Sequence, residues 1–424
     1  MKILMLGWEY PPKITGGLGV ACQGLAEALG SAGHQVHFLL PKKSPKQVSS
    51  LVKLIGASRL KPDLDFWKKE KKHTEVLTEV SFGKILVPYL PPQTFERAKK
   101  IQKTITKLEP TEESDLLEKV KLTGDYNGQL SAELIKYAML TVQTAHKVKP
   151  DVIHAHDWIT FRAGRMAKKA LGKPLFVHVH STEYDRNGQY AQPFVLDEER
   201  AGFEAADRIF CVSEKLKLTI IEKYQVTADR ITVVPNALTL KSNQNRTSRT
   251  PKNIAFIGRL TSQKSPGKLI DIARDMSSKG NDFQYMVIGD GYLMDELKGS
   301  LSGSPIANRF TFTGFLDRTE LLKKMSQIDL LVMPSASEPF GLVALEAILK
   351  GIPVVAAKGS GISEFVPSMP EVELWDSYSY NNIVERLMTD APYRETTVKK
   401  CQEEAGKLSW AKSVKIVEKA YSNH

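Results

Sequence analysis

Apolar residues along the chain gather in short runs that alternate with longer amphipathic stretches. The run KILMLG (2–7) is followed by helical spacing of apolar residues over 18–34 and by a second run, QVHFLLP (35–41). A continuous apolar run is typical of a parallel strand buried on both faces, and the spacing over 18–34 predicts an amphipathic helix. The first forty residues therefore predict a strand–helix–strand unit.

The same rhythm continues after a polar, lysine-rich stretch and predicts a helix over 129–147. Strands are then predicted at 151–158, 175–181, 208–213 and 231–236, and again at 253–260, 283–291, 309–315, 329–335 and 352–361. Strands that alternate with helical patterns indicate α/β domains with parallel sheets. We predict two doubly wound α/β domains, 1–238 and 253–405, joined by a polar linker at 239–252.

The lysine-rich stretch of about 42–125 breaks this rhythm. We interpret it as an insertion on the first domain, with a strand at 84–92 and surface helices over 98–121. The tail of the chain predicts closing helices.

Composition narrows the class of protein. The 424 residues are too many for one compact core, and the net charge of +11 favours anionic partners such as nucleic acid, anionic lipid or phosphorylated small molecules. The three cysteines, Cys22, Cys211 and Cys401, have no metal or disulfide spacing, which favours a reducing compartment. No leader peptide or membrane span is evident, so we expect a cytoplasmic protein without stable membrane insertion, and peripheral membrane contact stays open.

A glycine-rich turn follows the first predicted strand in YPPKITGGLGVA (10–21). Gly16 and Gly17 would let the backbone approach a ligand, and the helix that begins there favours anions. With Lys13 beside the glycines, the turn favours a phosphate or sugar site over a simple tight turn, although it is not the GxGxxG fingerprint of dinucleotide sites.

Two cations follow the first strand of the second predicted domain, in IGRLTSQK (257–264). Arg259 and Lys264 could be solvated surface residues. However, ligands of open α/β sheets bind at the carboxyl ends of strands, where this segment lies, and a rigid guanidinium with a mobile ammonium suits a diphosphate.

Histidines alternate along two predicted strands, in HAHDW (154–158) and HVHST (178–182). A zinc site needs three or four converging ligands, and the sequence does not place the remaining ones. We therefore favour contacts with sugar hydroxyls or the backbone and predict no metal site. The Asp63-Leu64-Asp65 pair of carboxylates lies in the polar insertion, so we interpret it as a coincidence rather than a metal motif.

Further candidate residues lie at strand ends of the second domain. The turns VIGDG (287–291) and AKGSG (357–361) could cradle phosphate with backbone amides. In SEPFGLVALE (337–346), Glu338 precedes a proline and Glu346 lies within the following helix. Carboxylates accept hydrogen bonds from hydroxyls, so these two residues indicate a ligand rich in hydroxyl groups more than a solvated pair.

Together, KITGGLG, HAHDW, GRLTSQK and EPFGLVALE resemble the retaining glycosyltransferases of family four, and within them the glycogen/starch synthase type. The resemblance covers nearly the whole chain outside 42–125. It implies the GT-B fold: two Rossmann-like domains with the active site in the cleft between them. The second domain would bind the nucleotide sugar, the first the acceptor, and a C-terminal helix within 406–424 would cross back to the first domain.

The resemblance also implies roles for individual residues. Arg259 and Lys264 would bind the leaving diphosphate, Glu338 the sugar hydroxyls, and His180 would lie near the C6 hydroxyl of the donor sugar. Catalytic roles thus fall to His180, Arg259, Lys264 and Glu338. The implied substrate-binding residues are Lys13, Gly16, Gly17, Asp157, Phe340, Gly341, Leu342 and Glu346, the last near the ribose, and the implied nucleotide-binding residues are Gly258, Gly289, Gly314, Ser360 and Gly361.

Two departures from the family pattern affect these expectations. The loop from Lys13 to Gly17 is one residue longer than the family's Lys-Thr-Gly-Gly form, which weakens the role expected for Lys13. Ser360 and Gly361 replace the commoner pair of glycines.

The function expected from the resemblance is transfer of glucose from ADP-glucose or UDP-glucose to an α-1,4-glucan, with no cofactor beyond the donor. The motifs do not determine the base. Alternatives are a glycosyltransferase with a lipid or small-molecule acceptor, and a nucleotide-sugar epimerase or a phosphorylase on the same scaffold. Nucleic-acid binding ranks last, because the lysine-rich segments contain few aromatic residues.

Overall fold

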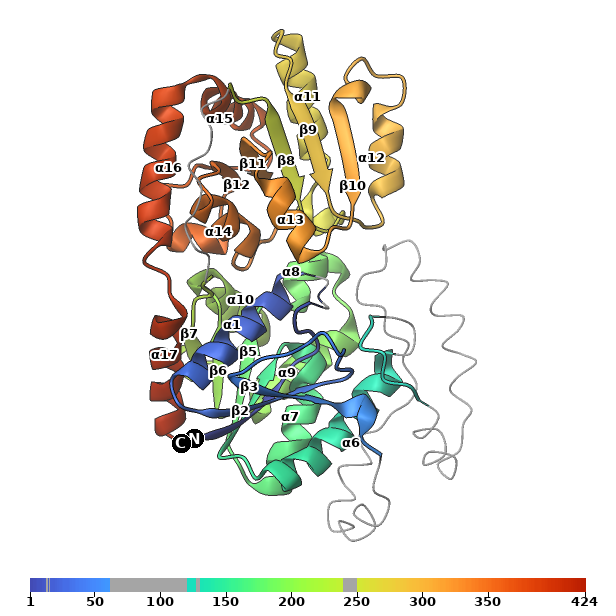
Figure 1. Ribbon diagram of the computed structural model, residues 1–424, viewed down its shortest axis with the longest axis vertical. Helices are drawn as coiled ribbons and strands as arrows, with labels where there is room; N and C mark the ends of the chain where they lie inside the picture. Colours follow the sequence, from blue (N-terminus) through green and yellow to red (C-terminus); the bar gives the residue numbers. More distant parts are fainter. Residues whose placement is uncertain (13, 15, 62–119, 127–129, 239–249) are drawn as a thin grey trace. The chain divides into compact units, whose positions relative to one another are not determined.

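The computed structural model describes residues 1–12, 14, 16–61, 120–126, 130–238 and 250–424, which form two compact units (Figure 1). The first unit comprises Met1–Cys211, Lys217–Val234 and Ser413–His424, and the second comprises Val212–Leu216 and Pro235–Lys412. Of the predicted linker 239–252, only the last three residues belong to the part that the structure describes.

Seven parallel strands form the sheet of the first unit, in the order β3-β2-β1-β4-β5-β6-β7. Their bounds are β1 Lys2–Leu6, β2 Gln35–Leu40, β3 Val52–Gly56, β4 Val152–His156, β5 Leu175–Val179, β6 Arg208–Cys211 and β7 Ile231–Val233. Every residue of β4 and β5 is buried. Burial on both faces agrees with the apolar residues of these strands, and it also encloses the histidines that interrupt them, His154, His156 and His178.

Helices connect these strands. They are α1 Gly17–Ser31, α6 Leu130–Val148, α7 Trp158–Leu171, α8 Glu183–Asn187, α9 Pro193–Ala205 and α10 Glu214–Tyr224. The last helix, α17 (Trp410–Ser422), lies largely within the segment Ser413–His424 that belongs to the first unit. Helix α7 packs against α6 and α9.

The predicted insertion needs a correction at its beginning. Val52–Gly56, within the stretch 42–125, is the edge strand β3, and its Val52 pairs with Val36 of β2. Lys53 is exposed between the buried residues Val52 and Leu54. Because buried and exposed residues alternate in this strand, it shows no continuous apolar run, and it was not recognised within the lysine-rich stretch. The strand predicted at 84–92 and the helices predicted over 98–121, apart from 120 and 121, lie outside the described residues.

Six parallel strands form the sheet of the second unit, in the order β10-β9-β8-β11-β12-β13. Their bounds are β8 Asn253–Ile257, β9 Gln284–Ile288, β10 Phe310–Gly314, β11 Leu330–Met333, β12 Val354–Ala357 and β13 Glu371–Val372. The helices are α11 Lys268–Ser278, α12 Met294–Leu301, α13 Arg318–Met325, α14 Leu342–Leu349, α15 Ser377–Thr389 and α16 Ala391–Ala405. The prediction of two Rossmann-like domains is confirmed.

The strand order of each sheet decides where a ligand can bind. In both sheets the first strand lies between a neighbour that follows it directly and a neighbour from later in the chain: β1 between β2 and β4, and β8 between β9 and β11. The connections leave such a pair in opposite directions and open a crevice at the carboxyl ends of the two strands. These crevices are the positions where the candidate residues should gather. None of the described helices is long and apolar enough to cross a membrane.

Candidate active site

In the second unit, the segments that follow β8 and β11 place a cation and a carboxylate in contact. Lys264 lies in the short 3₁₀-helix Ser262–Lys264, and its Nζ donates to Oε2 of Glu338 over 2.6 Å. The two side chains are 18% and 13% exposed, so water screens their attraction only in part. The pair therefore places a fixed positive and a fixed negative charge at the β8–β11 crevice.

Neighbouring contacts hold Glu338 and its loop. The hydroxyl of Ser335 donates to Oε2 of Glu338 at 3.1 Å. The side-chain amide of Gln263 donates to the carbonyl of Ser337 at 3.2 Å, and the backbone N–H of Ala336 donates to the carbonyl of Gln263 at 2.8 Å. The loop after β11 is thus bound to the loop after β8 by both backbone and side chains.

Glycines at the carboxyl ends of β8, β9 and β10 let the backbones of these strands approach one another closely. Gly258 and Arg259 directly follow β8, and a Cβ on Gly289 would lie 1.9 Å from the carbonyl oxygen of Gly258. Gly289 pairs with Gly314, and both have positive φ values, 135° and 69°. These positions require glycine for their backbone conformation, and at Gly289 for space as well. The backbones of Gly258 and Gly289 consequently lie in close contact next to Arg259, and the N–H groups of both glycines donate to backbone carbonyls.

A second close approach involves the other predicted glycine turn. A Cβ on Gly361 would lie 1.9 Å from the carbonyl oxygen of Pro339, and the N–H of Gly361 donates to the carbonyl of Glu338 at 2.9 Å. Ser360 is buried, and its hydroxyl has no hydrogen-bond partner in the described part of the chain. A buried hydroxyl without a partner is costly, so this group is available to a ligand.

The segment Phe340–Leu342 forms the junction between this loop and α14. Phe340 is buried and packs against Phe365, with ring centroids 5.7 Å apart. Gly341 precedes α14 with a φ of 105°, and Leu342 is the first residue of the helix. The left-handed conformation of Gly341 turns the chain sharply enough to bring Glu338 back toward the helix N-terminus.

Glu346 lies deeper in α14 and is 2% exposed. Its carboxylate forms an ion pair with Arg318, the first residue of α13. Burial raises the pKa of Glu346, while the nearby charge of Arg318 opposes this shift. The structure therefore separates the two glutamates of the motif: Glu338 contacts Lys264, and Glu346 contacts Arg318.

In the first unit, Asp157 and His180 meet where β4 and β5 end. Oδ1 of Asp157 accepts a hydrogen bond from the backbone N–H of His180 at 2.7 Å. Burial raises the pKa of Asp157 to about 6, although the charge of Arg186 and the N–H groups of His180 and Ser181 oppose this shift. Burial lowers the pKa of His180 to about 3, so its imidazole is neutral near pH 7.

The four histidines of β4 and β5 form two hydrogen-bonded pairs, one above the other. His154 Nε2 and His178 Nδ1 are 3.2 Å apart, and His156 Nδ1 and His180 Nε2 are 3.0 Å apart. Among the described residues, nitrogen atoms of His154, His156 and His178 lie within 4.8 Å of one another, as do ligand atoms of His156, His180 and Cys22. The rings of His154 and His156 are inclined by only 15°. The histidines thus form hydrogen bonds within each pair and stack between the pairs, and the expectation of no metal site stays a prediction.

The glycine turn after β1 is only partly described. Gly16 precedes α1 in an extended conformation with no atom within 4 Å of a Cβ built on it, and Gly17 begins the helix. Lys13 lies outside the described residues. The predicted phosphate or sugar site at this turn stays a prediction.

Each half of the chain matches a model of a known protein family. The family model described as starch synthase catalytic domain matches residues 2–237, more than half of the 424 residues. The chain belongs to the starch synthase catalytic domain family. The model for glycosyl transferases group 1 matches residues 239–403. The sequence-based resemblance to glycogen/starch synthases is thereby confirmed, as is the prediction that the protein is a glycosyltransferase.

Relatives agree with this assignment. An uncharacterized glycosyltransferase of Methanocaldococcus jannaschii is 26% identical, over 97% of this chain and 95% of that protein. A glycogen synthase of Mycobacterium tuberculosis is 26% identical, over 86% of this chain and 80% of that protein. Among solved structures, Anabaena HepE in complex with UDP and glucose has a TM-score of 0.67 at 18% identity, and all of both chains is covered. This structural similarity supports the GT-B fold.

Sequence reasoning did not find three residues that hold the candidate site of the second unit. Gln263, Arg318 and Ser335 contact Ser337, Glu346 and Glu338. Gln263 lies just after the predicted strand 253–260, and Ser335 is the last residue of the predicted strand 329–335, so their position was a usable signal. Arg318 opens a helix 28 residues before its partner, and nothing in the local sequence connects the two.

Proposed function

We propose that this glycosyltransferase transfers glucose from UDP-glucose or ADP-glucose to the non-reducing end of an α-1,4-glucan with retention of the anomeric configuration. The observation that carries the proposal is the contact between Lys264 and Glu338 at the β8–β11 crevice. It is supported by the family, by the relative named glycogen synthase, and by the HepE complex with UDP and glucose.

The charges suit the cleavage of a nucleotide sugar. Breaking the bond between the anomeric carbon and the phosphate oxygen leaves negative charge on the diphosphate and positive character on the sugar. In the proposed mechanism, the ammonium of Lys264 and the guanidinium of Arg259 stabilise the diphosphate. Glu338 accepts hydrogen bonds from hydroxyls of the sugar, and Glu346 and Arg318 lie toward the ribose.

Retention follows if the acceptor attacks the face from which the diphosphate departs. The departing phosphate oxygen then takes the proton of the acceptor hydroxyl, the new bond forms at the anomeric carbon, and the nucleoside diphosphate leaves. No metal ion or cofactor enters this proposal. The neutral His180 donates or accepts a hydrogen bond at the C6 hydroxyl and does not carry charge.

Nucleotide release from a panel of donors, with and without glycogen, tests the proposal. We expect release from UDP-glucose or ADP-glucose that depends on glycogen, is unchanged by EDTA and yields an α-linked product. Lys264→Ala and Glu338→Ala should each lower turnover about 100-fold or more while the protein stays folded.

The ion pair Lys252–Asp282 offers a matched control in the same unit. Its atoms are 3.1 Å apart, but its side chains are 54% and 73% exposed, and Lys252 lies before the amino end of β8. Lys252→Ala and Asp282→Asn should change turnover less than about twofold. Wild-type turnover in both site variants, or turnover that EDTA abolishes and manganese restores, contradicts the proposal.

The choice of acceptor is tested in the same assay. Release that depends on a lipid or small-molecule acceptor instead of glycogen supports the alternative glycosyltransferase, and liposome flotation detects peripheral membrane binding. Conversion of the donor to its epimer without any acceptor supports an epimerase.

A further inference from the structure

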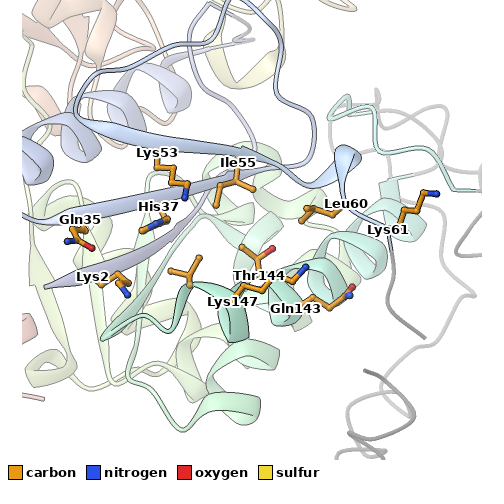
Figure 2. Close-up of a pocket in the computed structure, with 11 residues that line it drawn as sticks. Lys2, Gln35, His37, Lys53, Ile55, Leu60, Lys61, Gln143, Thr144 and Lys147 are labelled. Atoms are coloured by element: carbon orange, nitrogen blue, oxygen red, sulfur yellow. The ribbon is translucent and has the colours of Figure 1, made fainter. Parts of the chain in front are cut away.

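A cavity of about 470 Å³ in the first unit lies apart from the residues described above. It is bounded by β1, β2 and β3 on one side and by the last turns of α6 on the other (Figure 2). Lys2 and Gln35, which line it, are the first residues of their strands, whereas Asp157 and His180 follow the last residues of theirs. The volume falls within the range of small-molecule sites, about 300–1,000 Å³.

The lining is strongly cationic. Four lysines contribute to it: Lys2, Lys53, Lys61 and Lys147. In the described part of the chain, none of these ammonium groups forms an ion pair with a carboxylate. The C-terminal end of α6 contributes only about half a negative charge, so the cavity keeps a large positive excess. Such an excess favours an anion with more than one negative charge.

Two polar atoms in the lining lack partners. His37 Nδ1 and Gln143 Oε1 are buried and make no hydrogen bond in the described part of the chain. Figure 2 shows His37 and Lys53 projecting from the strands toward Gln143, Thr144 and Lys147 of α6. An amide oxygen can only accept a hydrogen bond, so Gln143 calls for a donor such as a hydroxyl. Leaving both atoms unpartnered costs free energy that a ligand would recover.

We infer that this cavity binds a small phosphorylated polyol, with the phosphate at the lysines and the hydroxyl groups at Gln143 and the end of α6. The lysines attract the dianion as point charges, and the unpartnered oxygen of Gln143 selects a ligand that carries hydroxyl groups. Inorganic phosphate has no hydroxyl group placed away from its charged oxygens, and an uncharged sugar has no charge for the lysines to attract. Among the described lining residues there is no Phe, Tyr or Trp, and His37 is the one aromatic ring, which gives little surface for stacking with a nucleobase.

Isothermal titration calorimetry with ribose 5-phosphate, inorganic phosphate and ribose tests the inference at physiological salt. We expect saturable binding of ribose 5-phosphate, binding of phosphate that is about tenfold weaker, and no detectable binding of ribose. Lys53→Ala/Lys147→Ala should weaken ribose 5-phosphate about tenfold or more, because two cations are lost. Gln143→Leu should reduce the preference for ribose 5-phosphate over phosphate.

Two controls separate this site from the others. Lys169→Ala/Lys173→Ala removes the same charge from exposed positions outside the cavity lining and should leave the affinity within about twofold. Glu338→Ala should also leave the affinity for ribose 5-phosphate unchanged. A loss of affinity in this variant would show that ribose 5-phosphate binds at the candidate active site instead. Circular dichroism and thermal unfolding confirm that each variant is folded.

Several outcomes overturn the inference. They are the absence of saturable binding, equal affinity in the two double-lysine variants, and loss of binding in Glu338→Ala. Binding of only a single-stranded oligonucleotide or of anionic vesicles, and not of ribose 5-phosphate, assigns the lysines to a macromolecular surface and also rejects it.

Discussion

Near the carboxyl ends of the strands, each unit has a buried residue whose charged form is disfavoured by burial. Asp157 and Glu346 are both buried carboxyl groups, and burial raises the pKa of each. They differ in their partners. Glu346 forms an ion pair with a guanidinium, whereas Asp157 is stabilised in its charged form by the charge of Arg186 and by the backbone N–H groups of His180 and Ser181. Asp157 is therefore the residue at which a titration experiment is most informative.

Asp157→Asn should reduce the dependence of stability on pH. The pKa of Asp157 rises from 3.8 to about 6 on folding, so the folded state binds the proton more tightly than the unfolded state. Stability from this group is therefore present at low pH and is lost as pH rises from about 4 to about 6. Asparagine keeps an acceptor oxygen for the backbone N–H of His180 and has nearly the same size and shape as aspartate.

Urea unfolding at pH 4.5 and at pH 7.5 measures this effect. The variant should gain about 2 kcal/mol relative to wild type between the two pH values. His180→Ala lacks the imidazole but keeps the backbone N–H that Asp157 accepts, so it should not reproduce the gain. An equal difference between variant and wild type at both pH values would show that Asp157 ionises normally.

The sequence predicted where candidate residues lie in the fold better than it predicted which side chains they contact. The position of Lys264 and Glu338 after two strands was enough to place them at one sheet edge, and the structure puts them in contact. The role expected for Glu346 at the ribose is untested, and its ion pair with Arg318 could not be foreseen. A contact between side chains on different helices depends on packing, which leaves no periodic signal in the sequence.

At the scale of elements, the close contact between the Gly361 turn and the loop after β11 positions Glu338. The backbone of Pro339 leaves no room for a side chain at Gly361, whereas a Cβ added to Gly299, within α12, would have no atom within 4 Å of it. The same substitution should consequently have opposite effects at the two sites.

Gly361→Ala should destabilise the second unit by about 1–3 kcal/mol, because the loop must shift to admit the methyl group. Gly299→Ala should stabilise it by about 0.5–1 kcal/mol, because alanine loses less backbone entropy in a helix. Urea unfolding measures both. Turnover should fall in Gly361→Ala, where Glu338 is displaced, and stay unchanged in Gly299→Ala. A Gly361→Ala protein as stable and active as wild type would show that the contact is dispensable.

Most strands and helices of the described residues were predictable from their apolar pattern, and two strands were not. The predicted strand at 329–335 contains β11, and the helix predicted over 129–147 matches α6 within a residue at each end. The strands β3 and β13 were missed. β3 alternates buried and exposed residues within a lysine-rich stretch, and β13 has only two residues, Glu371 and Val372. Both are edge strands, but so are β7 and β10, which the predicted strands at 231–236 and 309–315 contain, so edge position alone does not conceal a strand.

At the scale of the whole molecule, the chain builds two sheets with the same pattern of crossovers. The βα rhythm in the sequence was sufficient to predict this duplication. It did not show that the chain enters the second unit briefly at Val212–Leu216 before it leaves the first at Val234. Such an exchange depends on which surfaces pack together, and no local pattern encodes it.

The core of the first unit includes residues of the final helix, α17. Val417 and Tyr421 of α17 are buried, and the Tyr421 ring centroid lies 4.6 Å from that of Phe176 in β5. The Tyr421 hydroxyl also forms a hydrogen bond with Nδ1 of His154 in β4. The core of the first unit is thus completed by residues that are synthesised after the whole second unit.

Tyr421→Ala should therefore destabilise the first unit by about 3–5 kcal/mol, through the lost ring and the cavity that remains. Tyr421→Phe keeps the ring and should cost about 1–3 kcal/mol, because the buried Nδ1 of His154 loses its partner. Hydrogen–deuterium exchange resolves the two units: amides of β4, β5 and β6 should exchange faster in Tyr421→Ala, and those of β8, β9 and β11 should not. Lys415→Ala, on the exposed side of the same helix, should leave both sets unchanged. Equal loss of protection in both sheets would mean that the two units unfold as one.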